Sequence, residues 1–317
     1  MDDVKGALFE EARRLGFDRM AVTLPRVLER WRAEALARPD RRWADLAADP
    51  HALMPEAARV IVLARAYRPY RARAGEAAID AYYLCSNAAH LSARMLADWL
   101  TARGARALAG VKLPAKAVAS EAGFARYGLS GLTYMEGLGS RYALEALLTD
   151  AELPTDDAPP SEGFAPRCAH CRACVAACPT GALSGDGRVD TARCLRALPA
   201  GEPVDEARRA LVGASLLGCD LCQRACPINA GIAEQDMPDE LARALGLPGL
   251  LRGERTALAA LIGDNYARTK RVQARACLIA ANLMRRDCVP LIEALANDDH
   301  PAVRAHARWA AEQLRVR

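Results

Sequence analysis

Aromatic residues are scarce in this sequence of 317 residues, at 5% of the chain, and runs of β-branched residues are few. Both kinds of residue are favoured in β-strands. The hydrophobic content of 52%, with Ala and Leu prominent, is nevertheless enough for sizeable cores. We therefore expect much of the chain to be helical, and its length gives room for two or three domains.

Long apolar runs and a basic leader are also missing. No run reaches the roughly 18 residues that a membrane-spanning helix needs, and the chain opens on the acidic Met1-Asp2-Asp3. We therefore expect a cytoplasmic protein in a reducing compartment, with no signal peptide and no membrane partner.

Two common nucleotide-binding motifs are absent from the sequence. No GxGxxG stands at a strand–helix turn, and no Walker A loop occurs. Gly137-Leu138-Gly139 is the nearest approach, and it lacks the third glycine. The sequence therefore gives no support for a flavin or a nicotinamide cofactor.

Cysteine, by contrast, is abundant, with eleven in the chain and eight between residues 168 and 226. The first run reads Cys168-x2-Cys171-x2-Cys174-x3-Cys178-Pro179. This is the spacing of bacterial ferredoxins, in which three cysteines hold one 4Fe–4S cluster and the fourth holds its neighbour. The sequence therefore predicts two clusters and an electron-transfer protein.

The second run, Cys219-x2-Cys222-x3-Cys226-Pro227, lacks the first cysteine of that pattern, and the isolated Cys194 is the natural substitute. The fourth cysteine of each run binds the cluster of the other run, and this rule divides the eight cysteines into two sets. Cluster 1 takes Cys168, Cys171, Cys174 and Cys226; cluster 2 takes Cys178, Cys194, Cys219 and Cys222.

Other uses of the cysteines fit less well. Zinc sites pair C-x2-C units without this x2–x2–x3–Pro order, and the uneven distribution does not suit a disulfide framework. We expect His170, between two ligands, to be a solvated loop residue. Cys85, Cys277 and Cys288 stand among apolar residues, and we expect them to be core thiols.

Two clusters also change the charge of the chain. The formal net charge is +4, and each oxidised cluster with four thiolates carries about −2. The loaded protein is then close to neutral, so that any site for a polyanion must be a local patch.

Before the clusters, helical and strand patterns alternate. We expect a helix at 2–16, strands at 17–22 and 58–64, a helix at 77–102 and another at about 141–149. This predicts an α+β protein whose N-terminal α/β domain covers 1–153. The apolar residues at helical spacing in the long helix are Leu84, Ala88, Leu91, Met95 and Trp99.

A stretch rich in proline and acidic residues at 154–163 predicts an extended connector, and we place a ferredoxin-like two-cluster domain at 154–232. From 233 to 317 the pattern predicts roughly four short helices. Two helix pairs of this kind resemble HEAT-type repeats, and a plain helical cap over the clusters explains the pattern equally well.

One phrase of the second run is distinctive: Gly218-Cys219-Asp220-Leu221-Cys222-Gln223-x2-Cys226-Pro227-x-Asn229. Together with the isolated Cys194, it resembles the epoxyqueuosine reductases, cobalamin-dependent enzymes that complete queuosine in the tRNA wobble position. Further similar segments are Ala122-Gly123 to Gly128, Gly139-Ser140 to Asp150, and the tail around Val303-Arg304-x-His306-x2-Trp309. The resemblance covers nearly the whole chain and is strongest at 165–230.

The resemblance implies a base-off corrinoid held between the N-terminal domain and the clusters. Electrons would pass through the clusters to cobalt, which removes the epoxide oxygen. Gly128, Gly139, Ser140 and Asp220 fall where the family's corrinoid-facing segments lie, although turn glycines and a helix cap explain the same residues.

The sequence departs from the family at its proton donor. The family's aspartate falls in the segment 110–119, which here contains no carboxylate. Opening an epoxide calls for a general acid, and the candidates are Lys112, Lys116, Tyr127 and Tyr134. The lysines are equally explained as surface charges. This pattern is that of a paralogue that reduces a different substrate.

An arginine series marks a predicted helix at 268–287. Arg268, Arg271, Arg275 and Arg286 fall within a narrow arc beside an apolar stripe. They predict a strip that contacts tRNA phosphates, as this end does in the resembling family. An ordinary solvated face in an arginine-rich chain is the alternative.

We therefore expect a monomeric iron–sulfur oxidoreductase resembling epoxyqueuosine reductase, with an external ferredoxin- or flavodoxin-like electron donor. Its substrate is the epoxyqueuosine of tRNA or a different molecule. The alternative is a non-catalytic electron-transfer or activator protein that docks a partner protein.

Overall fold

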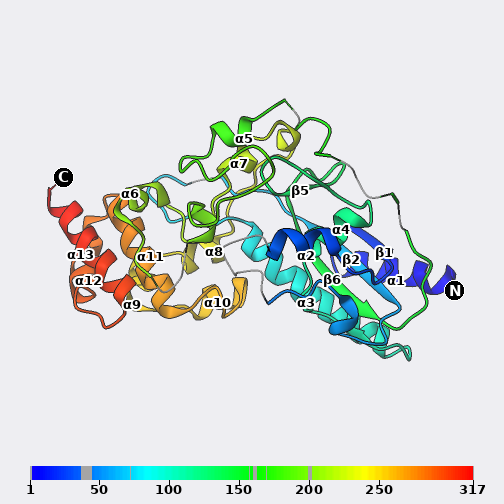
Figure 1. The fold of residues 1–317 in the computed structure, drawn as a ribbon. Coiled ribbons are helices and arrows are strands. Elements are labelled where there is room, and N and C mark those ends of the chain that lie inside the picture. The colour runs from blue at the N-terminus through cyan, green and yellow to red at the C-terminus, as the bar shows by residue number, and fades with distance from the viewer. Residues whose placement is uncertain are drawn as a thin grey trace.

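The structure, a computed structural model, describes residues 2–36, 45–71, 73–156, 158–159, 163–168, 170–198 and 202–316. A β-sheet with its helices lies toward the N-terminus, and a group of helices lies toward the C-terminus (Figure 1). The cysteine-rich segment, with α5 and α7, runs along the top of this view. The chain is thus a mixed α and β protein, as predicted.

Four antiparallel strands form the sheet in the order β1-β2-β6-β3. Val62 of β2 stands opposite Ala21 of β1 on one side and opposite Ala146 of β6 on the other. Only two residues of β3 pair with β6. The strands are β1 (Arg19–Thr23), β2 (Arg59–Ala66), β3 (Ala107–Leu108) and β6 (Tyr142–Thr149).

Helices cover both faces of this sheet. Leu63 and Leu147 pack with Leu96 beneath α1 (Asp2–Arg14) and α3 (Tyr82–Thr101). On the other face, Leu148 packs with Val118 of α4 (Ala115–Glu121), near α2 (Glu29–Leu36) and the short η1 (Pro50–Ala52). The sheet is therefore the middle layer of three, with apolar residues buried on both sides.

The predicted helix at 141–149 is wrong, because this segment is the strand β6. Its sequence, YALEALLT, is rich in helix-forming Ala and Leu. In the sheet, Ala143 and Leu147 pack on the α3 side, whereas Ala146 and Leu148 pack on the α4 side. Burial on both faces removes the polar–apolar alternation that indicates a strand.

The predicted long helix is present, but it begins at Tyr82 rather than at 77, and the apolar residues noted at helical spacing are not its buried face. Leu91 and Met95 are 51% and 53% exposed. The residues that face the sheet lie on a neighbouring stripe made largely of small side chains, which include Cys85, Ala89, Ala93, Leu96 and Leu100. Small side chains let the helix lie close to the sheet, and the larger apolar ones are left at the surface.

A small hairpin connects the sheet to the cysteine-rich segment. Its strands are β4 (Arg126–Tyr127) and β5 (Thr133–Tyr134), with Arg126 opposite Tyr134. Short turns make up most of the segment itself: α5 (Ala173–Ala176), η2 (Leu195–Ala197), α6 (Glu206–Arg209), η3 (Ala210–Val212), α7 (Leu221–Arg224) and η4 (Pro227–Asn229).

The C-terminal region has more helices than predicted. Its stretch 239–316, all of it described, contains six α-helices, and α11 packs against α9 and α13. They are α8 (Asp239–Ala244), α9 (Leu247–Arg252), α10 (Thr256–Ile262), α11 (Thr269–Asn282), α12 (Val289–Ala294) and α13 (Pro301–Val316), with the short η5 (Arg286–Cys288). The predicted helix at 268–287 therefore ends five residues early, before Met284, whose φ is +54°.

The core of this C-terminal region also takes residues from earlier in the chain. Ile79 and Tyr83, which precede and begin α3, and Leu217, which precedes α7, are buried in it. Two isolated bridges reinforce the link, Tyr70 with Gln235 and Ala78 with Ser215. The predicted domain limits at 153 and 232 remain predictions, and the hydrophobic cores cross both of them.

Within the described residues, none of the helices combines the length and the apolar character needed to cross a membrane. The predicted core thiols are confirmed, because Cys85, Cys277 and Cys288 are all buried. His170 is exposed, as predicted. Of the predicted connector at 154–163, residues 157 and 160–162 lie outside the described residues, while Asp156 is held by Lys5 and by the backbone of Val22.

Candidate metal centre

The first predicted set of cysteines is gathered next to the hairpin. Cys168, Cys174 and Cys226 are buried in one apolar cluster with Tyr134. Burial, followed by the nearby thiols of Cys226 and Cys171, raises the pKa of Cys168. Burial, Cys226 and Cys168 raise the pKa of Cys174 in the same way. These four cysteines are therefore neighbours of one another.

The second set is gathered on the side of the C-terminal helices. Burial raises the pKa of Cys219, and the nearby Cys194 and Cys178 add to the effect. Burial also raises the pKa of Cys222 to about 12, with Cys219 and Cys194 as the next contributions. The two sets match the division predicted from the crossing rule, although the assignment of ligands to clusters remains a prediction.

The spread of these cysteines differs from that of a mononuclear site. Among the residues that the structure describes, no three His, Cys, Asp or Glu side chains converge closely enough to hold one metal ion. A zinc site needs such convergence, whereas a 4Fe–4S cluster separates its four thiolates by its own width.

Two short helices present one cysteine from each set. Cys174 lies in α5 and Cys222 in α7, and the two helices contact each other (Figure 1). Arg172, between Cys171 and Cys174, has a left-handed backbone with φ of +48°, which turns the chain sharply between the two cysteines. The Ala182 N–H donates a hydrogen bond to Cys178 Sγ at 3.3 Å, a contact that stabilises a thiolate.

Tyr134 faces the first set of cysteines rather than open solvent. Its hydroxyl lies 3.5 Å from Cys226 Sγ and 3.3 Å from Ser130 Oγ. Burial, followed by the contact with Cys226, raises the pKa of Tyr134. If Cys226 held a cluster, it would be a thiolate, and the Tyr134 hydroxyl would donate its hydrogen to the sulfur. That proton would then be engaged and less available for a general acid to release.

The other predicted proton donors lie in different surroundings. Lys112 is exposed, and Lys116 Nζ donates a hydrogen bond to the Gly131 carbonyl at 2.9 Å. Tyr127 is half-buried on β4. The structure thus places Tyr127 and Tyr134 on one hairpin but leaves Lys112 at the surface, and the role of each as a donor remains a prediction.

Three of the predicted corrinoid-facing residues are in contact with this chain's own side chains. A Cβ on Gly139, whose φ is +56°, would collide with Asn229 Oδ1. The Ser140 N–H donates to the same Asn229 oxygen at 2.9 Å, and Gln223 Nε2 donates to the Ser140 carbonyl at 2.7 Å. A Cβ on Gly128 would collide with the Tyr134 ring and lie 3.1 Å from Cys168 Sγ.

Asp220, the fourth of these residues, is part of an ion-pair network. It accepts hydrogen bonds at 2.9 Å from both Arg141 Nη1 and Arg224 Nε. Arg141 is 3% exposed and also lies 3.4 Å from Gln223 Oε1. The pair therefore joins the end of the sheet to α7, which carries Cys222.

These contacts bear on whether the four positions fit a corrinoid. Tyr134 and Asn229 fill the space beside Gly128 and Gly139, and Asp220 is already paired. As they stand, the four residues do not form a cradle for a large macrocycle. A corrinoid at this place therefore remains a prediction, and we derive no chemical step through it.

Sequence reasoning missed two partly buried carboxyl groups. Burial raises the pKa of Glu145 on β6 to about 7, with His90 Nδ1 3.8 Å from its carboxylate. Burial also raises the pKa of Glu121, which lies just beyond the carboxylate-free segment 110–119. It also missed Asn229 and Gln223 as the links to Ser140, although both stand in the distinctive phrase of the second cysteine run.

The predicted arginine strip is not one continuous surface. Arg268 and Arg286 are exposed, and Arg271 is half-buried. Arg275 is buried, at 9% exposed, because it lies on the inner side of α11. The expectation that all four contact a polyanion at the surface is therefore wrong for Arg275, and Arg286 lies beyond the end of α11.

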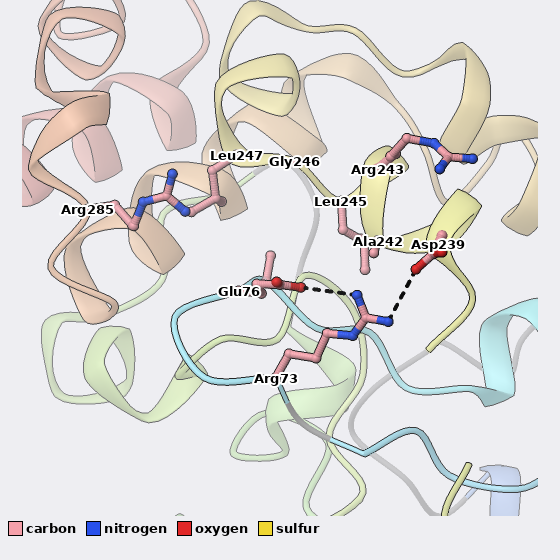
Figure 2. Close-up of a pocket in the computed structure, with 10 residues that line it drawn as sticks. Arg73, Glu76, Asp239, Ala242, Arg243, Leu245, Gly246, Leu247 and Arg285 are labelled. Carbon is pink, nitrogen blue, oxygen red and sulfur yellow. Dashed lines mark ion pairs between the residues drawn. The ribbon is translucent and has the colours of Figure 1, made fainter. Parts of the chain in front are cut away.

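A cavity of about 350 Å³ opens between the segment around Arg73 and the helices α8 and α9. Figure 2 shows Arg73 pointing between Glu76 and Asp239, with ion pairs at 3.8 and 3.6 Å. Arg285, at its far side, is paired with Asp287 at 2.7 Å. Acidic partners already meet these two charges, so the cavity offers no strong anchor for a ligand.

Known proteins agree with this arrangement. Residues 167–229 match the family described as a 4Fe-4S double cluster binding domain. Epoxyqueuosine reductase of Listeria monocytogenes is 34% identical over 208 residues, which are 62% of this chain and 53% of that protein. The chain thus spans about half the length of the curated relatives that it matches.

Solved structures show the same fold. Epoxyqueuosine reductase of Bacillus subtilis, with its catalytic loop swung out of the active site, superposes with a TM-score of 0.77 at 24% identity. An epoxyqueuosine reductase bound to an epoxyqueuosine-modified tRNA stem loop gives the same TM-score and identity. Each comparison covers 98% of this chain and 90% of the other.

The chain is therefore an iron–sulfur protein with a domain for two 4Fe–4S clusters. Within that class it is similar to the epoxyqueuosine reductases, with 27–37% identity to several of them over part of their length.

Proposed function

We propose that this chain is an iron–sulfur reductase of the epoxyqueuosine reductase type. Two 4Fe–4S clusters pass electrons to a substrate that binds beside the N-terminal domain. The observation that carries the proposal is the contact between the first set of cysteines and the hairpin, where Gly128 packs against Cys168 and the Tyr134 hydroxyl faces Cys226. Cluster 1 is therefore the point at which electrons leave the relay.

Cluster 2 lies on the side of the C-terminal helices and receives electrons from an external ferredoxin- or flavodoxin-like donor. The chain is proposed to work as a monomer in the cytoplasm. In this proposal the chain is divided as predicted, with an α/β substrate domain at 1–153, a ferredoxin-like domain at 154–232 and HEAT-like helices at 233–317.

The proposed substrate is an epoxyqueuosine nucleotide in tRNA, because a relative of the same fold was solved with a modified tRNA stem loop. The exposed Arg268 and Arg286 are candidates for contacts with its phosphates. Opening the epoxide needs a proton at the oxygen that is released. Tyr127 is the candidate donor on this hairpin, because the hydroxyl of the other tyrosine, Tyr134, faces Cys226.

Complementation of a bacterial strain that lacks its own epoxyqueuosine reductase tests this proposal. We expect queuosine to reappear in the tRNA nucleosides, measured by mass spectrometry, when the chain is expressed. The matched control is Cys174→Ala, which removes a ligand of cluster 1 and should leave epoxyqueuosine unreduced. Absence of queuosine, while the purified protein shows both clusters, would exclude this substrate.

Cobalt content decides the predicted corrinoid separately. Protein purified from cells supplied with cobalamin would contain about one cobalt per chain if the prediction holds. The geometry around Gly128 and Gly139 requires Tyr134 and Asn229 to move for this to happen.

A second function is favoured by one specific observation, the absence of any carboxylate at 110–119. In this alternative the chain is a non-catalytic electron carrier or activator for a partner protein. Steady turnover of the modified stem loop by the isolated, chemically reduced protein would rule it out.

A further inference from the structure

A second cavity, of about 270 Å³, lies where the three parts of the molecule meet. Its walls come from residues 78–81 before α3, from 211–221 in the cysteine-rich segment, and from α11. Cys219 also lines it, so that the cavity adjoins the second set of cysteines. Four residues with a function predicted from the sequence line it: Cys219, Asp220, Arg271 and Arg275.

Positive charge dominates the lining of this cavity. It includes five arginines and two aspartates, Asp80 and Asp220. Three of the arginines are neutralised by nearby carboxylates. These pairs are Arg71 with Asp236 at 3.2 Å, Arg196 with Asp80 at 3.0 Å and Arg224 with Asp220 at 2.9 Å. Both aspartates of the lining are therefore already engaged.

The remaining two arginines, Arg271 and Arg275, lie one turn apart on α11. Arg275 makes no hydrogen bond or ion pair with any residue that the structure describes, although it is 9% exposed. Arg271 contacts only the ring of Tyr266, with its guanidinium carbon 5.7 Å from the ring centre. Two guanidinium groups thus share one cavity without a counter-charge.

A buried charge in this state is costly. Burial, followed by repulsion from Arg271, lowers the pKa of Arg275 to about 10, so that the side chain is still charged at neutral pH. A buried charge without a partner destabilises a protein unless a ligand or ion compensates it. The cavity is therefore suited to an anion.

We propose that this cavity binds the phosphate group of a small organic ligand through Arg275 and Arg271. A phosphate monoester carries close to two negative charges at neutral pH, which matches the two uncompensated guanidinium groups better than one carboxylate does. The flat donor fork of arginine suits phosphate oxygens. Leu195, Val212 and Leu216 offer apolar walls for the rest of the ligand.

The size of the cavity limits that ligand. At about 270 Å³ it falls just below the usual range of pockets for drug-sized molecules. A mononucleotide is near the upper limit of what it accepts. The proposal does not depend on the reductase activity, because binding here is measured without turnover.

One competing explanation lies within the molecule. The negative charge of cluster 2 would also compensate Arg275, since Cys219 lines the same cavity. In that case Arg275 would alter the reduction potential of cluster 2, and added phosphate would not bind. The experiment below separates the two.

The test uses the anaerobic protein with both clusters in place. Inorganic phosphate and guanosine 5′-monophosphate are titrated by calorimetry and by the shift of the thermal midpoint, with chloride at equal ionic strength as the reference. We expect both to bind saturably at one site per chain, and the nucleotide to bind more tightly than inorganic phosphate.

Variants on α11 connect the binding to the two arginines. Arg275→Met should weaken the binding of both probes roughly tenfold or more, because a charged hydrogen-bond donor is lost. The same variant should melt at or above the wild-type temperature when no anion is present, which shows that it folds. Arg271→Gln should weaken binding less. Lys270→Gln, an exposed change on the same helix, should leave binding unchanged.

Three results would overturn the proposal. They are no saturable effect of either probe on the wild type, equal binding by wild type and Arg275→Met, or a changed potential of cluster 2 in Arg275→Met without any effect of phosphate. Equal affinity for the two probes would exclude an organic ligand and leave a site for the free ion.

Discussion

The sheet and the C-terminal helices each bury one ionisable side chain without a full counter-charge. In the sheet, Glu145 is 15% exposed, and burial raises its pKa to about 7. In the helices, Arg275 is 9% exposed, and burial and Arg271 lower its pKa to about 10. At neutral pH, about half of the Glu145 side chains are protonated, whereas Arg275 stays charged.

The two regions therefore differ in how the unfavourable free energy of the buried charge is relieved. Glu145 can take up a proton from water and become neutral at a modest pH, with only His90 nearby. Arg275 cannot lose its proton under ordinary conditions, so that only an anion can compensate it. A buried carboxyl can become neutral by itself, whereas a buried guanidinium needs a carboxylate, as Arg141 has in Asp220, or another anion.

The largest test of this comparison concerns the cysteines, because those predicted to hold cluster 1 lie on the sheet side and those predicted to hold cluster 2 lie toward the C-terminal helices. We expect Cys226→Ala and Cys174→Ala to remove the same electron paramagnetic resonance signal, and Cys178→Ala and Cys222→Ala to remove the other. Each variant should retain about four iron atoms per chain. Cys85→Ala should retain both signals, since this thiol lies on the buried face of α3.

Loss of one signal by both Cys226→Ala and Cys222→Ala would contradict the crossed arrangement. The two cysteines are close in sequence, and an uncrossed arrangement would place them on one cluster.

The next effect concerns the ion pair between Arg141 and Asp220, which joins the sheet to α7. Asp220→Asn leaves Arg141, at 3% exposed, without a carboxylate. We expect a loss of roughly 3–5 kcal/mol in the free energy of unfolding, measured as a lower urea midpoint of the anaerobic protein. Glu10→Gln, in an exposed pair with Arg13, should change it by less than about 1 kcal/mol. If Asp220→Asn leaves the stability unchanged, the ion pair is not the role of Asp220, and corrinoid binding is the better explanation.

A slightly smaller effect, on the free energy of unfolding, comes from Glu145 and depends on pH. The folded pKa of Glu145 lies above its ordinary value of 4.5. The protonated carboxyl therefore contributes stability that is complete below pH 4.5 and is lost as pH rises to about 7. We expect Glu145→Gln to match the wild type near pH 4.5 and to be more stable by about 3 kcal/mol at pH 8. Urea denaturation at the two pH values measures this, and equal differences at both would show that the carboxyl is not buried.

The smallest effect concerns the Tyr134 hydroxyl, which faces Cys226. Tyr134→Phe removes a donor to Cys226 Sγ and leaves the packing against Gly128. Because that hydrogen bond favours the more negative reduced state, we expect the potential of cluster 1 to fall by roughly 20–60 mV. Tyr142→Phe, whose hydroxyl donates to Thr133, is the matched control. Anaerobic redox titration should show cluster 2 unchanged, and a shift of both clusters would indicate a general disturbance.

The sequence predicted the metal centre better than it predicted the fold around it. Cluster ligands come at short, fixed spacings, because four thiolates must surround one object, and this geometry is visible in the spacing from Cys168 to Cys178. Partners such as Tyr134 and Asn229 carry no such signal. They reach Cys226 and Ser140 only after distant segments have packed together.

The fold was harder to predict where burial removed the local pattern. β6 consists of residues that favour helices, and only its position between β2 and β3 makes it a strand. The stripe with Leu91 and Met95 was more hydrophobic than the true inner face of α3, which is made largely of alanines. Arg275 shows the reverse case, in which a charged side chain lies inside because its helix is surrounded.

The core that Ile79, Tyr83 and Leu217 share with the C-terminal helices has a consequence for how this molecule can change over time. A cysteine-rich segment transplanted alone into another protein would expose Leu217, and helices grafted elsewhere would lack the side chains that complete their interior. The three parts are thus inherited as one unit, and recombination at their boundaries would yield chains that aggregate rather than new combinations of function.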